Sequence, residues 1–271
     1  MKINIFRKLG TRLLFSATLV LSCSAFAQVE LTWSKGVFIL PTELAQQAGT
    51  PIGKVALIEK HIDTLKNLAA PVKFKPAVLM HGCGGISAEN IAHAKLLADM
   101  GIPVFLPSFY ARSNAPTLCA GRSDGMPFFV TFSHQNLAQR VEEFEFAVSK
   151  LHELPFVDHT HVLATGHSMG GITVARLRNP AIQASVITGW GCFSPYSEQS
   201  MKNVPQLAVR FKVDPFLNNS GACEVKLFSG RDPENTFSVV LDGQETHEVM
   251  HNEKARAEIQ KFVQAYFIKA P

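Results

Sequence analysis

The sequence predicts an α/β protein in which a mostly parallel sheet carries helices on both faces. Short apolar runs that suit buried strands alternate with segments whose apolar residues recur at helical spacing, which is typical of parallel sheets covered by helices. Two glycine-rich turns directly follow predicted strands. The chain has 271 residues, 46% hydrophobic and 18% charged, which is enough for one large core or two modest ones. In such sheets the reactive groups gather beyond the carboxyl ends of the strands.

The strands are expected where apolar residues run without interruption for about the length of a buried strand. They are Ala77–Met80, Ile102–Leu106, His161–Thr165, Ser185–Trp190, Gln206–Phe211 and Phe237–Leu241, with Val225–Phe228 as a further candidate. The helices are expected where apolar residues repeat every three to four positions. They are Ile52–Leu68, Ala88–Met100, Phe132–Leu151, Gly170–Leu177 and Asn252–Phe267.

The first 27 residues have the three parts of a secretory signal peptide. A basic stretch ends at Arg12, an apolar run covers Leu13–Leu21, and small residues end in Ala25-Phe26-Ala27. The apolar run is shorter than the roughly 20 residues that span a bilayer. We therefore expect cleavage after Ala27, a periplasmic or secreted protein with no membrane span in its mature form, and a single domain over residues 28–271. The residues up to Cys23 match a lipoprotein processing site only poorly, and Ala25-Phe26-Ala27 is the better match to a cleavage site.

The net charge of +4 belongs to this leader. All four surplus cations lie in the first dozen residues, and Glu30 is the first acid. Residues 28–271 are formally neutral, so composition gives no support for a nucleic-acid partner.

Export also changes the interpretation of the cysteines. Four remain after cleavage, and an even number in an oxidising compartment predicts two disulfides. Of the three possible pairings we expect Cys83 with Cys119 and Cys192 with Cys223, because the predicted architecture places each pair at neighbouring strand ends.

The most informative segment is Gly166-His-Ser168-Met-Gly170, a Gly-x-Ser-x-Gly motif between a predicted strand and a predicted helix. A serine on so sharp a turn has a strained backbone, and its flanking positions must lack side chains. The helix that begins there points its amides at the site, which favours developing negative charge. Ser168 is therefore the candidate nucleophile.

A second glycine-rich turn, His81-Gly-Cys83-Gly-Gly85, follows the predicted strand Ala77–Met80. This position suits a loop that supplies a backbone N–H to an oxyanion hole, so we expect the amides of Cys83 and Met169 to form the hole. A phosphate-binding loop is the alternative, but neither Gly-Lys-Ser/Thr nor Gly-x-Gly-x-x-Gly is present.

Together these motifs resemble the α/β-hydrolase superfamily. The segment Pro107-Ser-Phe-Tyr110-Ala-Arg112 is similar to the Pro-Asp-Leu-Tyr-Ala-Arg segment of the dienelactone hydrolase family, and the resemblance covers roughly residues 74–268. It implies that Arg112, with Tyr110 beside it, binds a carboxylate of the substrate. The chain differs from the best-known members in two ways: Ser168 replaces a cysteine nucleophile, and Ser108 replaces an aspartate.

A serine nucleophile needs a histidine to take its proton and a carboxylate to orient that histidine. In this fold the chain order is serine, acid, histidine. Asp214, before Pro215 at the end of a predicted strand, is the candidate acid, with Asp232 and Asp242 as weaker alternatives. His247 is the candidate base because it follows the last predicted strand and precedes the last helix. His167 is expected to pack within the nucleophile turn.

Two other classes of function compete with a serine hydrolase. His247-Glu248-x-x-His251 matches the His-Glu-x-x-His motif of zinc metallopeptidases, although Lys254 stands where the extended motif has glycine and only Glu253 and Glu258 follow as acidic ligands. The second alternative is a non-catalytic binding protein of the same fold.

The sequence therefore predicts an exported serine esterase that uses no metal or cofactor and acts on a small-molecule ester. The stretch Ser108–Phe129 hints at an acidic or aromatic ester, and the oligomeric state stays open.

Overall fold

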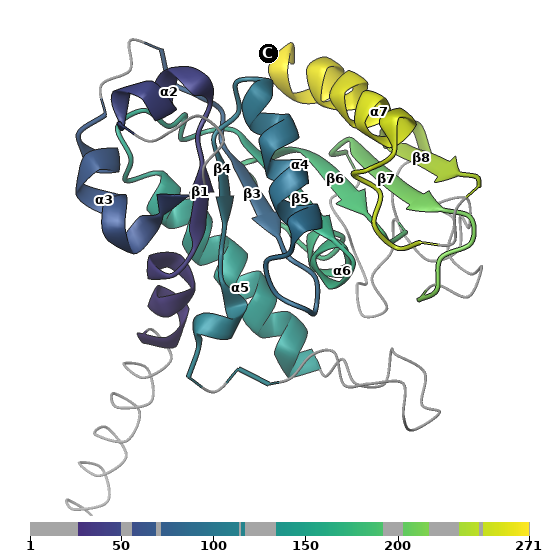
Figure 1. The fold of residues 1–271 in the computed structure, drawn as a ribbon, viewed down its shortest axis with the longest axis horizontal. Helices are drawn as coiled ribbons and strands as arrows, with labels where there is room; N and C mark the ends of the chain where they lie inside the picture. Colours follow the sequence, from purple (N-terminus) through teal and green to yellow (C-terminus); the bar gives the residue numbers. More distant parts are fainter. Residues whose placement is uncertain are drawn as a thin grey trace, which may run out of the picture.

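A computed structural model describes residues 27–49, 56–68, 72–113, 115–116, 134–191, 203–216, 233–243 and 246–270. Within these residues an eight-stranded sheet has the order β2-β1-β4-β3-β5-β6-β7-β8 (Figure 1). β1 pairs antiparallel with β2 and β4, and the other pairings are parallel. The predicted mostly parallel sheet is confirmed.

The strands are β1 Val37–Ile39, β2 Ala56–Leu57, β3 Ala77–Met80, β4 Val104–Leu106, β5 Val162–His167, β6 Ile182–Thr188, β7 Gln206–Phe211 and β8 Thr236–Leu241. β3 to β8 match the predicted apolar runs closely, whereas β1 and β2 were not predicted. The largest shift is in β6, which begins and ends earlier than predicted because Gly189 turns the chain with a φ of 61°. The candidate strand Val225–Phe228 lies outside the described residues.

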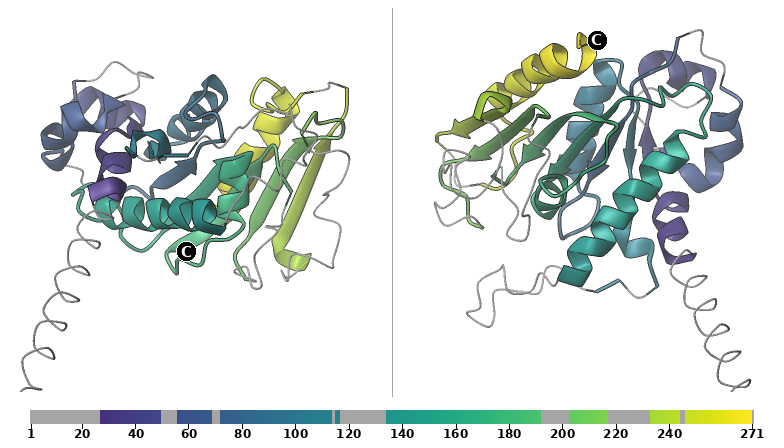
Figure 2. Two further views of the ribbon diagram at one scale, coloured as in Figure 1. Left: turned by 90° about the horizontal axis from the view of Figure 1, so that it is seen from below. Right: turned by 180° about the vertical axis from the view of Figure 1, so that it is seen from behind.

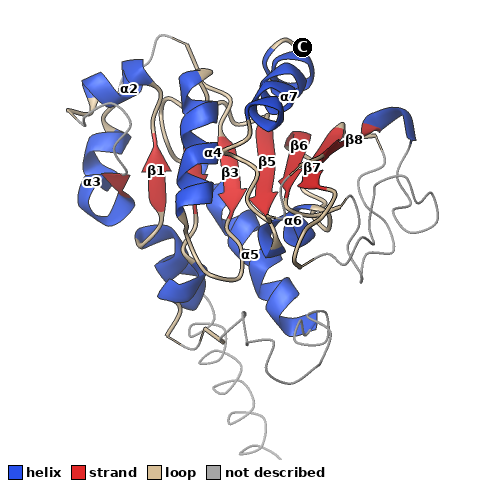
Figure 3. Ribbon diagram, turned by 45° about the vertical axis from the view of Figure 1, so that its right-hand side comes forward, coloured by secondary structure: helices blue, strands red, loops and turns tan. Residues whose placement is uncertain are grey.

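Helices cover both faces of the sheet, as predicted. They are α2 Thr42–Gln47, α3 Ile58–Lys66, α4 Ala88–Asp99, α5 His134–Leu151, α6 Met169–Val174 and α7 Glu253–Val263, which continues into a π-helical turn at Gln264–Ile268. α4 and α7 lie on one face, and α5 and α6 lie on the other (Figures 2 and 3). Among the described helices none is long and apolar enough to cross a bilayer.

The part of the chain before β3 differs from the prediction. The expected helix Ile52–Leu68 is shorter, because α3 begins at Ile58 after the two-residue strand β2. Residues 27–34 are helical and contribute buried Val29 and Trp33, although residues 1–26 of the expected leader lie outside the described residues.

The core forms two layers because side chains on a strand alternate between its faces. In β3, Val78 and Met80 pack toward α5 and α6, whereas Ala77 and Leu79 pack toward α4 and α7. Both faces are therefore apolar, and the polar residues of the site lie where the strands end.

The end of the last helix is tied back to the segment before β3. Lys75 Nζ donates to the carbonyls of Phe267 and Ala270 at 3.0 and 2.9 Å, and to Gln183 at 3.2 Å.

Candidate active site

Ser168 sits on a strained turn between β5 and α6. Its φ of 55° and ψ of −118° make it the one non-glycine residue with positive φ in the described parts of the chain. A Cβ added at Gly166 would lie 2.4 Å from the Gly170 carbonyl, and one added at Gly170 would lie 1.9 Å from the Met80 carbonyl oxygen. Both glycines of the motif are therefore required by close backbone approach.

The predicted oxyanion loop lies directly beside this turn. A Cβ added at Gly82 would lie 3.4 Å from Ser168 Cβ. Gly82 and Gly85 form an isolated bridge that closes the loop. Met169 is the first residue of α6, so its amide N–H has no partner within the helix. The loop that carries Cys83 thus packs against the turn that carries Ser168 and Met169, and the use of the two amides as an oxyanion hole stays a prediction.

A buried network under the loop fixes its backbone. His81 Nδ1 lies 2.6 Å from the Gly82 carbonyl oxygen, and the Phe109 N–H donates to His81 Nε2 at 3.1 Å. A carbonyl only accepts, so these partners assign a neutral His81 protonated at Nδ1. Burial and the Arg140 charge hold the pKa of His81 well below its usual value. A planar trans peptide then directs the Cys83 N–H away from the His81 ring.

Arg140 on α5 completes this network. Its Nη2 donates to the His81 carbonyl at 2.6 Å, and its Nη1 donates to Glu143 at 2.8 Å. Both side chains are fully buried. Burial raises the pKa of Glu143, and Arg140 opposes that rise. Neither residue was singled out from the sequence, although Arg140 shares a helix face with the core residues Leu137 and Phe144.

Tyr110 and Arg112, the two residues expected to bind substrate, contact the oxyanion loop and α5. The Tyr110 hydroxyl donates to the Cys83 carbonyl, and its ring stacks on His81 with centroids 6.0 Å apart. The buried Arg112 donates through Nη2 to Glu142 and to the Gln139 carbonyl, both at 3.2 Å. A substrate carboxylate would therefore share Arg112 with Glu142, and the predicted binding role stays a prediction.

The candidate acid and base are hydrogen-bonded to each other. His247 Nδ1 lies 2.7 Å from Asp214 Oδ2, while Asp214 Oδ1 accepts the Phe216 N–H at 2.8 Å. A carboxylate only accepts, so His247 is protonated at Nδ1 and its Nε2 can accept a proton. That Nε2 is buried and has no hydrogen-bond partner within the described residues. The acid therefore orients the candidate base as a triad requires, whereas no hydrogen bond joins Nε2 to Ser168 in the structure.

Two rings enclose His247. The His167 and Phe216 rings lie with centroids 4.8 and 4.7 Å from that of His247. His167 Nδ1 is 3.2 Å from the Thr188 hydroxyl, and burial lowers the pKa of His167 to about 3. A neutral His167 packs in the turn, and Phe216 leaves 43% of its surface exposed beside the base.

The geometry of the zinc motif does not match a metallopeptidase. Residues 247–251 are not helical, because α7 begins only at Glu253. His251 stacks on Phe211, with centroids 5.8 Å apart, while His247 is engaged by Asp214. No group of three metal-ligating side chains occurs in the described residues.

One of the predicted disulfide cysteines can be placed. Cys83 is disulfide-bonded, which anchors the predicted oxyanion loop. Cys23, Cys119, Cys192 and Cys223 lie outside the described residues, so the pairing stays a prediction.

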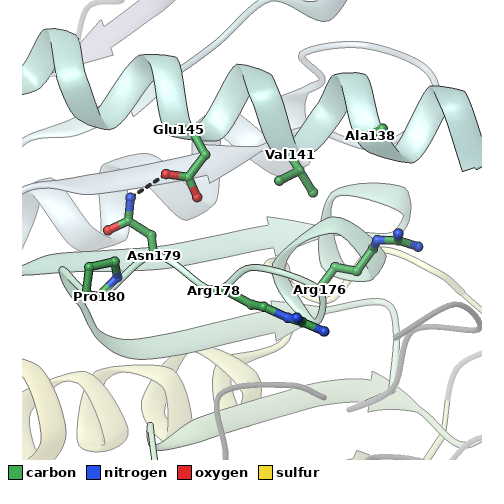
Figure 4. Close-up of a pocket in the computed structure, with 7 residues that line it drawn as sticks. All are labelled: Ala138, Val141, Glu145, Arg176, Arg178, Asn179 and Pro180. Atoms are coloured by element: carbon green, nitrogen blue, oxygen red, sulfur yellow. Dashed lines mark hydrogen bonds between the residues drawn. The ribbon is translucent and has the colours of Figure 1, made fainter. Parts of the chain in front are cut away.

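A surface hollow of about 630 Å³ lies elsewhere, between α5 and the segment after α6 (Figure 4). Its lining includes Arg176, Arg178 and Asn179, which hydrogen-bonds Glu145, and includes none of the candidate catalytic residues.

Comparisons with known proteins agree with this fold. Solved structures with similar folds include a putative dienelactone hydrolase from Klebsiella pneumoniae (TM-score 0.54, 17% identity, 74% of this chain and 90% of that one). A second is Est1E from Butyrivibrio proteoclasticus, with a TM-score of 0.51 and 15% identity over 73% of this chain and 90% of that one. A third is the esterase Est2 from Thermogutta terrifontis, with a TM-score of 0.51 and 15% identity over 76% of this chain and 88% of that one. No curated protein matches the chain.

The fold is thus that of an α/β hydrolase. The family model of the dienelactone hydrolase family matches residues 64–226, which is more than half of the chain. The protein belongs to the dienelactone hydrolase family, a family of hydrolytic enzymes.

Proposed function

We propose that this protein is an exported serine hydrolase that cleaves a small-molecule ester. The observation that carries the proposal is the alignment of Asp214 with His247 at the carboxyl edge of the same sheet on which Ser168 stands on its strained turn. The order of these residues in the chain is the order used by α/β hydrolases.

The residues supply each step of an acyl transfer. Ser168 Oγ attacks the ester carbonyl while His247 Nε2 takes its proton, and Asp214 stabilises the imidazolium that forms. The amides of Cys83 and Met169 bind the oxyanion. The C–O bond then breaks, and the alcohol leaves with the proton from His247. Water, deprotonated by His247, releases the acid and restores Ser168.

The nucleophile is tested with a fluorophosphonate probe and a short-chain p-nitrophenyl ester. We expect wild type to be labelled and to hydrolyse the ester, and Ser168→Ala to lose labelling and to lose at least about 10⁴-fold in kcat/KM. His251→Gln is the matched control, because it removes the second histidine of the zinc motif. Hydrolysis that survives in Ser168→Ala and stops with a chelator would favour a metallopeptidase. No turnover of an ester panel and no labelling would favour a binding protein.

The substrate is proposed to carry a free carboxylate that binds Arg112. Arg112→Met should raise KM about tenfold for a p-nitrophenyl succinate monoester, and leave KM for the uncharged valerate ester unchanged. Glu142→Gln, which releases Arg112 from its ion pair, should lower KM for the succinate ester only. Equal effects on both esters would exclude this role for Arg112.

Export is proposed with cleavage after Ala27. Gln28 is held in the folded part, because its side-chain oxygen accepts from the Ser113 N–H and hydroxyl at 2.8 and 3.0 Å. N-terminal sequencing of the exported protein should begin at Gln28, and any other start would contradict the proposed site.

A further inference from the structure

The buried carboxylate of Glu89 binds the backbone just after the candidate base His247. Glu89 is the second residue of α4, and 6% of its surface is exposed. Its Oε1 accepts the N–H of Val249 at 2.8 Å and the N–H of Met250 at 2.9 Å, and its Oε2 lies 3.2 Å from the Met250 nitrogen. One carboxylate therefore holds two successive amides that lie 160 and 161 residues further along the chain.

These amides belong to the short turn that carries His247. Val249 and Met250 are buried, and the Met250 carbonyl accepts from Arg256 Nη1 of α7 at 2.7 Å. The His247 ring is thus fixed at two points, by Asp214 at Nδ1 and by the clamped backbone two residues further on.

We propose that Glu89 is a positioning residue for His247, whose carboxylate clamps the backbone of the turn after it and so holds Nε2 in reach of Ser168. The inference rests on the proposed role of His247 as general base. It assigns a function to an acid that precedes the nucleophile in the chain by almost eighty residues.

The charges around Glu89 agree with this role. It lies in the first turn of α4, where the helix dipole favours a negative charge. Burial raises the pKa of Glu89, and the two backbone hydrogen bonds oppose that rise. Glu248 of the same turn raises the pKa further and His247 lowers it, while Arg256 faces the clamped turn from α7.

Three variants separate the hydrogen bonds between Glu89 and the two amides from its negative charge. Glu89→Ala removes both, and we expect kcat per labelled active site to fall about 30- to 100-fold, because misplacing a catalytic group by about 1 Å costs about 10²-fold. Glu89→Gln keeps one acceptor oxygen, so its kcat should fall less than about fivefold. Glu248→Gln is the matched control, because it removes an exposed carboxylate of the same turn that contacts neither amide. Its kcat should stay within about twofold.

A further readout distinguishes positioning from general stability. The proton NMR resonance of the His247 Nδ1–H, assigned by its absence in His247→Gln, should shift or broaden in Glu89→Ala and stay in place in Glu248→Gln.

Some outcomes would overturn the proposal. If Glu89→Ala melts at a lower temperature but keeps its kcat per labelled site and its Nδ1–H resonance, Glu89 is only structural. The NMR measurement needs no turnover. If wild type fails to hydrolyse esters while the resonance still shifts in Glu89→Ala, the proposed function fails and the clamp stands.

Discussion

The two halves of the candidate site are held by different means. The nucleophile half, which is Ser168 with the loop of residues 82–85, stands on the central strands β3 and β5 and is fixed by backbone contacts and by buried charges from α5. The acid–base half, Asp214 with His247, stands on turns after β7 and β8 near the edge of the sheet and is held by side-chain hydrogen bonds.

The difference follows from what each half must present. An oxyanion hole uses backbone amides, so its peptide planes must be fixed, and dense packing at the centre of the sheet achieves this. The acid–base pair uses side chains, which a few directed hydrogen bonds can orient on a less crowded turn. Changes to the buried charges at the centre of the sheet should thus mainly lower stability, and changes to the acid–base pair at its edge should mainly lower activity.

In this comparison the largest expected effect is a loss of kcat, caused by a change to the acid–base pair at the edge of the sheet. Asp214→Asn keeps the side-chain shape but lets His247 take the wrong tautomer, so kcat should fall about 10⁴-fold while the melting temperature changes little. Ester kinetics and a thermal melt of the same sample check both parts. A loss below tenfold would mean that another acid, such as Asp242, orients His247.

The next effect is on stability, at the centre. Arg140→Met leaves the Glu143 carboxyl buried without its cation, and the free energy of unfolding should fall by about 3–5 kcal/mol. Arg140→Met/Glu143→Leu should recover part of this, because the buried charge is then gone as well. Urea denaturation measures both proteins. If the double variant is less stable than Arg140→Met, the buried pair is not the cause.

The smallest effect concerns acid stability, again at the centre. Burial lowers the pKa of His93 to about 4 and that of His167 to about 3. An unfolded histidine binds a proton near pH 6.5 and the folded one does not. The stability from each histidine is therefore complete above pH 6.5 and is lost as the pH falls toward the folded pKa, by about 1.4 kcal/mol per pH unit.

His93→Gln should reduce this dependence. Between pH 6.5 and 5, the slope of unfolding free energy against pH should be smaller by about 1.4 kcal/mol per unit than in wild type. Above pH 7.5 the two slopes should agree, which serves as the internal control. An unchanged slope at low pH would show that the folded protein takes up the proton at His93.

The sequence predicted the parts of the molecule that local pattern determines. The central strands are uninterrupted apolar runs, and the Gly-x-Ser-x-Gly turn follows from steric needs within five residues. β1 was missed because three residues, Val37–Ile39, are too few to show a period, and the strand exists through its antiparallel pairing with β4.

Glu89 and Arg140, which hold parts of the site in place, were not predicted from the sequence, for a different reason. Glu89 meets Val249 and Met250 only because α4 and α7 pack on the same face of the sheet. Their distance along the chain leaves no local signature. Arg140 did leave one, since a charged residue on an apolar helix face signals a buried partner, here Glu143.

Lys75 binds the carbonyls of Phe267 and Ala270 and so joins the start of the parallel sheet to the last turn of the chain. A ribosome making this protein has delivered every strand before it delivers those two carbonyls. Lys75 therefore gains these partners only after all the described strands have been made, and this contact forms late in the synthesis of the fold.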